Sequence, residues 1–349
     1  MMAVTVPQDN IIKGYKKPNH GIFRFLPDSW VPYAELMRLD RLSGFWAFYW
    51  HYLIGLGYAI NLPPASQFMD FKALVHTAAY LGLWTTIFRG ITCTWNDNLD
   101  QDLDRQVARC RARPIARGAV TTSKAHMFTI AQMAVGAYTL SPFQGSVLIH
   151  ATINGALLFI YPLLKRCTDF PQVELGFGLS YAIFIVAAIL GNDPFMSLWD
   201  SSTDFSDRLS KIAASPLAQS SGFLYAAGIF WCIIFDTVYA HQDYEDDLKA
   251  GVRGLAVRLG RNGTKPALLL TAAVQVYCLV LAGQHAGLGT LYYTFSCGGA
   301  AGVLATMLWA VKLDNSSSCA WWFGPGNSCV GATVTVGLFA EFFVSKRSY

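Results

Sequence analysis

Long apolar runs separated by shorter polar stretches dominate this 349-residue chain. Each run of about twenty apolar residues is long enough to cross a bilayer as a helix. Nine such runs occur, at residues 36–60, 71–95, 122–141, 144–164, 174–191, 219–240, 267–286, 288–311 and 328–345. The pattern predicts an all-α, polytopic membrane protein with nine transmembrane helices.

The polar stretches define the domain organisation. Residues 1–32 are predicted to form a cytosolic N-terminal segment, and residues 33–349 a single nine-helix transmembrane domain. The N-terminal segment shows neither the apolar core of a signal peptide nor a clear transit peptide. Residues 192–221 are polar and rich in serine, which predicts a loop or a short surface helix.

Charge sorts the loops into two sides. Most lysines and arginines lie in the segment up to Arg41, in the loops after the second and sixth runs, at Lys165-Arg166 and at Lys312. The positive-inside rule places these loops and the N-terminus in the cytosol, and an odd number of spans places the C-terminus across the membrane. The lipid bilayer is therefore an expected partner.

Composition excludes several other classes of protein. Only 14% of the residues are charged and 53% are hydrophobic, whereas about a quarter are charged in an ordinary soluble domain. The net charge of +4 is spread over loops, so no nucleic acid partner is indicated. The eight cysteines lack paired spacing, which favours reduced thiols over disulfides or a metal–thiolate site.

A first acidic motif, W-N-D-N-L-D-Q-D-L-D, ends the second apolar run. Asn96, Asp100 and Asp104 are spaced by four residues, and Asp97 lies three before Asp100, so a helix presents all four on one side. Carboxylates crowded in this way repel one another unless a cation lies between them. Magnesium is the expected cation, since it prefers oxygen ligands and commonly binds carboxylates together with substrate phosphates.

A second acidic motif, Y-A-H-Q-D-Y-E-D-D-L-K, ends the sixth run. Tyr239, Asp243 and Asp247 repeat the spacing of four, and Asp246 lies three beyond Asp243. One acidic helix end is ordinarily a solvated cap. Two such ends on the same side of the membrane predict a diphosphate held by magnesium between two acidic walls.

Basic residues surround both motifs. The loop after the first motif is expected to bind phosphate, since planar guanidinium groups bond it bidentately, or to anchor the loop to anionic headgroups. It contains Arg105, Arg109, Arg111, Arg113 and Arg117. Arg113 is the first choice because Pro114 fixes the backbone beside it. Lys165 and Arg166 offer charge from a further helix end, or act as membrane anchors.

Other polar residues lie within or beside the apolar runs. Arg38 and Asp40 open the first run and are candidates for binding an acidic or phenolic acceptor molecule. Arg89 lies inside the second run, where a charge is costly, so it is expected to face the bundle interior or a wet cavity, or to pair with a carboxylate as a structural contact. His51 and His150 are interpreted as core residues without a ligand role.

This set of groups suits the ionisation of an allylic diphosphate. Magnesium and basic side chains would draw charge onto the diphosphate and weaken its C–O bond. Aromatic walls would shield the resulting allylic cation from water, because their faces attract positive charge. The expected nucleophile is an electron-rich carbon of a phenolic ring.

The motifs resemble those of a known family. The run R-G-I-T-C-T-W-N-D-N-L-D-Q-D-L-D, followed by R-C-R-A-R-P-I-A-R-G, resembles the first signature of the UbiA-type intramembrane prenyltransferases, and Y-A-H-Q-D-Y-E-D-D-L-K-A-G-V-R resembles the second. M-R-L-D-R and Y-P-L-L-K-R are similar to two further motifs. The resemblance implies a nine-helix bundle around a central cavity, magnesium, and transfer of a polyprenyl group from its diphosphate to an aromatic acceptor.

The resemblance also implies roles by position. Asn96, Asp100, Asp243 and Asp247 match magnesium and diphosphate residues. The other positions that match the signatures are the acids Asp97, Asp104 and Asp246 and the basic residues Arg113, Lys165 and Arg166.

Two departures bear on the acceptor. Members that make ubiquinone resemble D-K-P-I-G and W-P along the first span, whereas this chain has D-R-L-S-G and W-H. The chain is more similar to fungal members that farnesylate aromatic polyketides in meroterpenoid pathways, which favours the endoplasmic reticulum over the mitochondrial inner membrane. Three alternatives stay open: a 4-hydroxybenzoate polyprenyltransferase of ubiquinone synthesis, a UbiA-type terpene cyclase, and a non-enzymatic carrier of anionic lipids.

Overall fold

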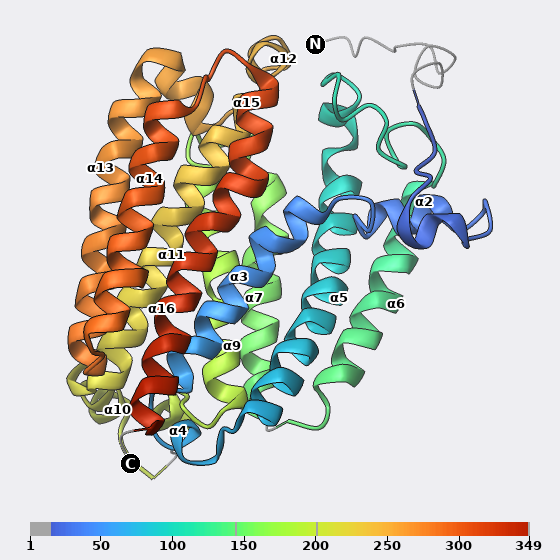
Figure 1. Cartoon of the computed structure of the whole chain (residues 1–349). Coiled ribbons are helices and arrows are strands. Elements are labelled where there is room, and N and C mark those ends of the chain that lie inside the picture. Colours follow the sequence, from blue (N-terminus) through green and yellow to red (C-terminus); the bar gives the residue numbers. More distant parts are fainter. Residues whose placement is uncertain (1–14, 144, 200–201, 348–349) are drawn as a thin grey trace.

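Helices make up the whole of the regular structure in the computed structural model, which describes residues 15–143, 145–199 and 202–347. The longer helices stand side by side along one axis, and the short helix α2 lies across them at one side (Figure 1). The helices before residue 190 are η1 (Gly21–Arg24), α2 (Val31–Leu36), α3 (Leu42–Ala59), α4 (Ala65–Phe68), α5 (Phe71–Asp104), α6 (Thr122–Leu140), α7 (Gly145–Leu164), α8 (Pro171–Ser180) and α9 (Ala182–Ile189). The predicted N-terminal segment is described only from residue 15 onward.

The second half of the chain completes the bundle. It contains η2 (Met196–Trp199), α10 (Phe205–Ala214), α11 (Pro216–Ala240), α12 (Tyr244–Ala250), α13 (Leu255–Ala286), η3 (Tyr292–Gly298), α14 (Gly299–Ala310), α15 (Ser316–Trp321), η4 (Trp322–Gly326) and α16 (Asn327–Arg347). Helix α10 has no buried residue, which confirms the short surface helix expected between residues 192 and 221.

Each predicted span overlaps one or two helices over most of its described residues. Among the described residues, five helical stretches are long and apolar enough to cross a membrane: Gly145–Leu164, Pro171–Ile189, Pro216–Ala240, Leu255–Ala286 and Ser316–Ser345. The all-helical, multi-pass fold is thus confirmed, whereas nine as the number of crossings stays a prediction. Helix α5 carries Arg89 and the acidic motif along its 34 residues, so it is less apolar than these five.

Local sequence sets the helix ends. The side chain of Asp70 caps α5 by accepting a hydrogen bond from the Ala73 amide (2.7 Å). Helix α11 begins with Ser215 as N-cap and Pro216 as its first residue, a position that tolerates proline. At the end of α13, Gly287 takes a positive φ of 66°, which glycine adopts without steric cost.

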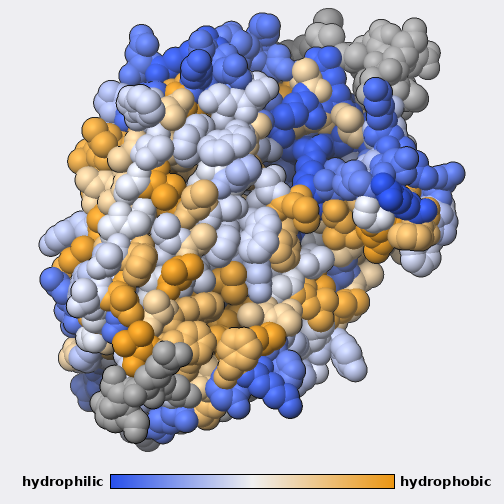
Figure 2. Space-filling model, in the orientation of Figure 1, coloured by the Kyte–Doolittle hydropathy of each residue, from blue (hydrophilic) through white to orange (hydrophobic). Residues whose placement is uncertain are grey.

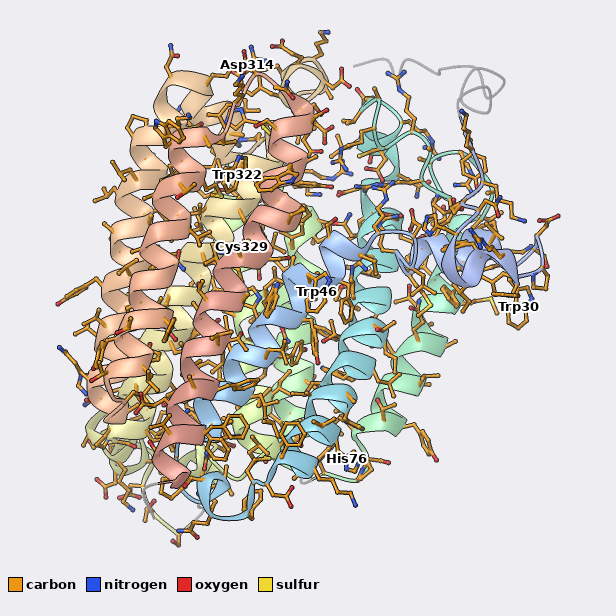
Figure 3. The ribbon with its side chains drawn as sticks, in the orientation of Figure 1. Trp30, Trp46, His76, Asp314, Trp322 and Cys329 are labelled. Carbon is orange, nitrogen blue, oxygen red and sulfur yellow. The ribbon has the colours of Figure 1, made fainter. Side chains whose placement is uncertain are left out.

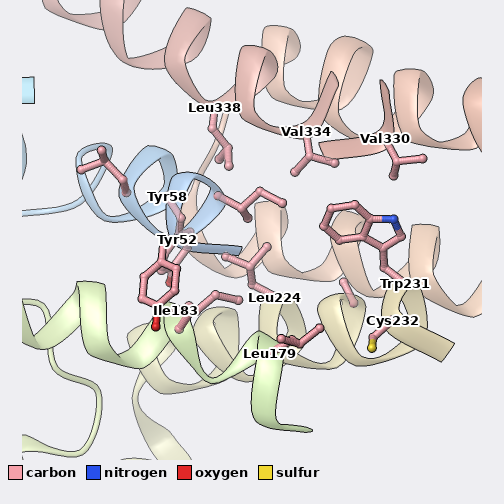
Figure 4. Close-up of a cluster of buried hydrophobic side chains, with 14 of the residues drawn as sticks. Tyr52, Tyr58, Leu179, Ile183, Leu224, Trp231, Cys232, Val330, Val334 and Leu338 are labelled. Atoms are coloured by element: carbon pink, nitrogen blue, oxygen red, sulfur yellow. The ribbon is translucent and has the colours of Figure 1, made fainter. Parts of the chain in front are cut away.

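The core lies where α3, α9, α11 and α16 meet. Figure 4 shows Tyr52, Ile183, Leu224 and Leu338 converging there from different helices. Tyr52 accepts a hydrogen bond from the Trp84 indole (2.8 Å), which satisfies a polar group in an apolar setting. The core therefore ties helices from both halves of the chain into one unit.

The positions of Arg89, His51 and His150 in the bundle test three predictions made from the sequence. Arg89 is 6% exposed and faces the bundle interior, as expected, and it donates to the main-chain carbonyls of Arg38 (3.0 Å) and Arg41 (2.9 Å) rather than to the carboxylate of the alternative prediction. Its guanidinium instead satisfies carbonyl groups where the chain turns between α2 and α3. His51 and His150 are both 1% exposed within the bundle, as expected for core residues.

The level of the membrane boundary can be inferred on one side. Figure 3 shows Trp30 at the start of α2 and Trp46 on α3 at about the same height along the bundle. Both side chains are exposed, by 64% and 36%. Tryptophans at one level are typical of a membrane–water interface, and α2 lies flat at that level.

Close packing of α8 on α11 generates a first prediction. A Cβ on Gly176 would lie 3.0 Å from the main-chain oxygen of Ile229 and 3.1 Å from its Cα, atoms that cannot move aside alone. We expect Gly176→Ala to destabilise the protein by about 1–3 kcal/mol, because overpacking forces the two helices apart. Thermal unfolding in detergent measures this. Gly155→Ala in α7 is the matched control, since its Cβ would meet nothing within 4 Å; equal midpoints for the two variants would contradict the argument.

Candidate active site

A cavity of about 270 Å³ opens where α5 ends and α12 begins. On the face shown in Figure 2, hydrophilic side chains gather at the upper end and around a hollow there, whereas hydrophobic ones predominate below. Eight of the predicted site residues line the cavity: Arg38, Asn96, Asp100, Asp104, Arg113, Lys165, Asp243 and Asp247. Segments up to about 200 residues apart in sequence therefore meet in one site.

The end of α5 forms the first acidic wall. Asn96 donates from Nδ2 to Oδ2 of Asp100 (3.1 Å), which confirms that residues four apart share a face. Asp97 is fully buried beside this face and lies behind the cavity lining. A helix C-terminus carries partial negative charge, so it does not stabilise ionised carboxylates there. These carboxylates require nearby cations.

The second wall is built from two helices rather than one. Helix α11 ends at Ala240, and Asp243 immediately precedes α12, which carries Asp247. The spacing of four suggested a continuous helix, but the chain turns between Ala240 and Tyr244. Tyr239, Asp243 and Asp247 nevertheless all line the cavity.

Three of the carboxylates that line the cavity, those of Asp100, Asp104 and Asp243, have a basic partner from another segment. The Lys165 ammonium lies 2.6 Å from Oδ2 of Asp100 and 4.9 Å from the centre of the Tyr161 ring. Arg113 contacts Asp104 (2.9 Å) and Asp97 (3.2 Å). These contacts keep the buried charges compensated.

Arg109 joins the loop that follows the first wall to the second wall. Its guanidinium lies 2.5 Å from Oδ2 of Asp243 and donates to the Tyr239 hydroxyl (2.6 Å). Beside it, the Ala108 amide donates to Asp246 (2.9 Å). The loop after the first motif is thereby held against the second motif.

Four predicted residues lie outside the cavity lining. Asp97 is buried behind it, and Asp246 serves the loop contact just described. Arg166 turns to the surface, where it pairs with Asp102 (2.6 Å). Asp40 contacts Arg41 (3.3 Å) and has one buried oxygen without a hydrogen-bond partner. The proposed roles of all site residues stay predictions.

Asp236 was missed by sequence reasoning. It is 9% exposed on α11 and lines the cavity, as do Tyr161 and Gln172. The signal was present, because Asp236 precedes Asp243 by seven residues, two helical turns on the same face. It was overlooked because it lies inside the apolar run, away from the acidic cluster.

The acids fit a magnesium ion that shares its coordination with a substrate. Oδ1 of Asp100 is buried and has no hydrogen-bond partner. Burial, and then the nearby charge of Asp243, raise the pKa of Asp247 to about 7, so this site favours an added cation. Among the described residues no three His, Cys, Asp or Glu side chains form a ready ligand cluster. This agrees with an ion held by one or two carboxylates plus phosphates.

The fold and the site define a membrane-embedded enzyme class with two acidic walls and basic partners around one cavity. Residues 45–331 match the model of the UbiA prenyltransferase family. The chain belongs to this family and is a prenyltransferase.

Named relatives and a solved structure agree with this assignment. The chain is 37% identical over 298 residues to the prenyltransferase ascA of Acremonium egyptiacum, covering 84% of this chain and 81% of the relative. It is 31% identical to 4-hydroxybenzoate geranyltransferase 1 of Lithospermum erythrorhizon, covering 96% and 97%. A UbiA homolog from Archaeoglobus fulgidus bound to DMAPP and Mg²⁺ superimposes with a TM-score of 0.62 at 17% identity, covering 90% and 99%, which shows a shared fold.

The bridging position of Arg109 generates a second prediction. We expect Arg109→Gln to lower prenyl transfer on the order of tenfold to a hundredfold, because Asp243 loses its charge partner and the loop after the first wall loses its link to the second wall. Turnover in membranes measures this, normalised to the amount of folded protein.

The matched control lies two residues away. Arg111 is exposed and donates only to the main-chain oxygens of Arg105 (3.1 Å) and Gln106 (3.2 Å). Arg111→Gln is expected to retain turnover close to that of the unmodified protein. Equal losses of turnover in the two variants would show that turnover depends on the total positive charge of the loop rather than on the contact between Arg109 and Asp243.

Proposed function

We propose that this enzyme transfers a polyprenyl group, farnesyl as the first choice, from its diphosphate to a carbon of a phenolic aromatic acceptor with the help of Mg²⁺. An aromatic polyketide of a meroterpenoid pathway, a branch of secondary metabolism, is the proposed acceptor. The supporting observation is that Asp100 and Asp243, 143 residues apart, line one cavity with basic residues between them.

The ion pairs suggest how the donor binds without leaving charges uncompensated. Asp100 is paired with Lys165, and Asp243 with Arg109. A magnesium diphosphate offers a cation to each carboxylate and an anion to each basic side chain. Binding then exchanges partners within the cavity, so the net cost of burying the diphosphate is small.

Different residues of the cavity are proposed to bind the diphosphate and to exclude water. When bound, Mg²⁺ acts as a Lewis acid on the diphosphate and weakens the allylic C–O bond. Lys165, Arg109 and Arg113 hold the departing diphosphate, since guanidinium and ammonium groups pair with phosphate oxygens. The rings of Phe48, Tyr161 and Tyr239 line the cavity and exclude water from the allylic cation.

Fewer contacts support the proposed binding site for the aromatic acceptor. Arg38 lines the cavity and is held by Asp97 at 2.5 Å, so it is the better candidate for an acidic or phenolic acceptor. Asp40 lies beyond the lining. We assign it no direct contact with the acceptor and retain only a supporting role for its buried carboxylate at the α2–α3 turn.

The membrane setting follows from charge. The basic loops surround the cavity end of the bundle, which supports an active site facing the cytosol. We propose the endoplasmic reticulum membrane as the location, with the mitochondrial inner membrane as the alternative. The polyprenyl tail of the donor would lie among the helices or in lipid.

One other acceptor has a specific observation in its favour. The similarity to a 4-hydroxybenzoate geranyltransferase extends over 96% of this chain. Mass spectrometry of products from microsomes given geranyl, farnesyl or geranylgeranyl diphosphate with a panel of phenolic acids separates the two acceptor classes.

Farnesyl diphosphate given without an acceptor tests the cyclase alternative, because release of a cyclic hydrocarbon would favour that reaction. Metal-dependent release of pyrophosphate is not expected of a carrier of anionic lipids.

The two walls generate a third prediction. We expect Asp100→Ala and Asp243→Ala each to lower turnover by at least about a hundredfold, because each removes a carboxylate proposed to bind magnesium while no apolar span is interrupted. Product formation and membrane insertion are measured together. Asp102→Ala is the control from the same helix, since Asp102 is exposed and outside the cavity. Near-normal turnover in either wall variant would exclude the proposed metal site.

A further inference from the structure

A buried ion pair outside the cavity joins helix α2 to the arginine loop, which we define as residues 105–120. Nη2 of Arg117 lies 2.5 Å from Oε2 of Glu35 on α2, although 82 residues separate them. The two side chains are 7% and 9% exposed. Neither residue lines the cavity, so neither contacts a substrate held there.

Tyr15 covers this pair from the N-terminal side. Its hydroxyl donates to Oε1 of Glu35 (2.9 Å), and its ring lies 3.9 Å from the guanidinium carbon of Arg117. Burial, with the hydrogen bond to Glu35, raises the pKa of Tyr15 to about 12, so the phenol keeps the proton that it donates. Nη1 of Arg117 also donates to the Ala112 carbonyl (2.5 Å). Both carboxylate oxygens and both terminal nitrogens therefore have partners.

The pair closes a ring of contacts that passes through the site. Glu35 lies three residues before Arg38, and Arg117 lies four residues after Arg113. Arg38 and Arg113 meet at the same oxygen of Asp97, at 2.5 and 3.2 Å. Helix α2 and the arginine loop are thus joined twice, once at Asp97 and once at the Glu35–Arg117 pair.

The contact at Asp97 needs support from elsewhere. Two guanidinium groups that converge on one carboxylate oxygen repel each other. Arg38 also has a φ of +57°, a left-handed conformation that costs energy for a residue with a side chain. Such a conformation persists only where the surroundings fix it.

We propose that Glu35 and Arg117 are positioning residues: their ion pair under Tyr15 fixes the arginine loop against α2, so that Arg113 is held at the diphosphate site. The inference rests on the proposed diphosphate function of that site. It assigns to residues 15–41 a part in donor binding that the acidic and basic motifs do not supply.

The expected effect is specific to the donor. Loss of the pair frees the arginine loop, so Arg113 spends less time at Asp104 and Asp97. We expect Glu35→Gln and Arg117→Gln each to raise the KM for the prenyl diphosphate and the inhibition constant of inorganic pyrophosphate on the order of tenfold. The KM for the aromatic acceptor is expected to stay within about twofold. A general loss of folding would instead lower the amount of active enzyme and leave both KM values unchanged.

A double-mutant cycle in the full-length enzyme tests the coupling. If the residues act as one unit, Glu35→Gln with Arg117→Gln is no worse than either single variant, and Arg117→Lys retains part of the donor affinity. Asp28→Asn is the matched control. Asp28 is an exposed residue between Tyr15 and Arg41, and among the described residues its ion pair is with Lys17. It is expected to leave both KM values unchanged.

Three outcomes would overturn the inference: unchanged pyrophosphate inhibition in both single variants, fully additive losses in the double variant, or equal shifts in the two KM values. The unmodified enzyme separates this from failure of the proposed function. If the unmodified enzyme neither consumes prenyl diphosphate nor is inhibited by pyrophosphate, the function is wrong. If it does both and the variants match it, only the positioning role is wrong.

Discussion

The site depends on ion pairs in which buried carboxylates meet cations from other segments of the chain. Asp100 takes Lys165 from the end of α7, Asp243 takes Arg109 from the arginine loop, and Asp97 takes Arg38 from the N-terminal side. An unpaired charge at such depth would cost several kcal/mol, so these contacts hold the helix ends in place. In the proposed function, a metal ion and a diphosphate exchange with these ion pairs. The side chains that stabilise the helix ends are then the same ones that are proposed to bind the substrate.

Much of this arrangement was predictable from the sequence. Apolar runs located the helices, because about twenty apolar residues have few other folds available. Spacing by four placed Asn96 and Asp100 on one face, and the hydrogen bond between them confirms it. The two acidic motifs and their basic neighbours were specific enough to indicate a UbiA prenyltransferase, and the family match over residues 45–331 confirms it.

What the sequence did not reveal depends on contacts between distant segments. Helix α13 spans Leu255–Ala286, but Gly260 (φ 64°, ψ 176°) breaks it, so a short helical segment that the apolar pattern did not predict precedes the predicted run. Arg89 could not be assigned to carbonyl partners, since the turn that presents those carbonyls exists only after α2 and α3 fold. Arg109 was one of five similar arginines, and only the fold distinguishes it as the link to Asp243. Hydropathy likewise conceals Asp236, a single acid within a long apolar run.

The length of α5 fixes the height at which the reaction takes place. Its 34 residues extend about 51 Å, whereas the hydrocarbon layer of a bilayer is about 30 Å thick. Measured from Phe71, Asp100 lies about 44 Å along the axis, a length greater than the thickness of that layer. The proposed donor is an amphiphile whose polyprenyl tail lies in the hydrocarbon layer while its charged diphosphate stays outside it. A site at this end of α5 would receive such a donor by lateral diffusion, with the tail still in the hydrocarbon layer and the diphosphate at the membrane surface.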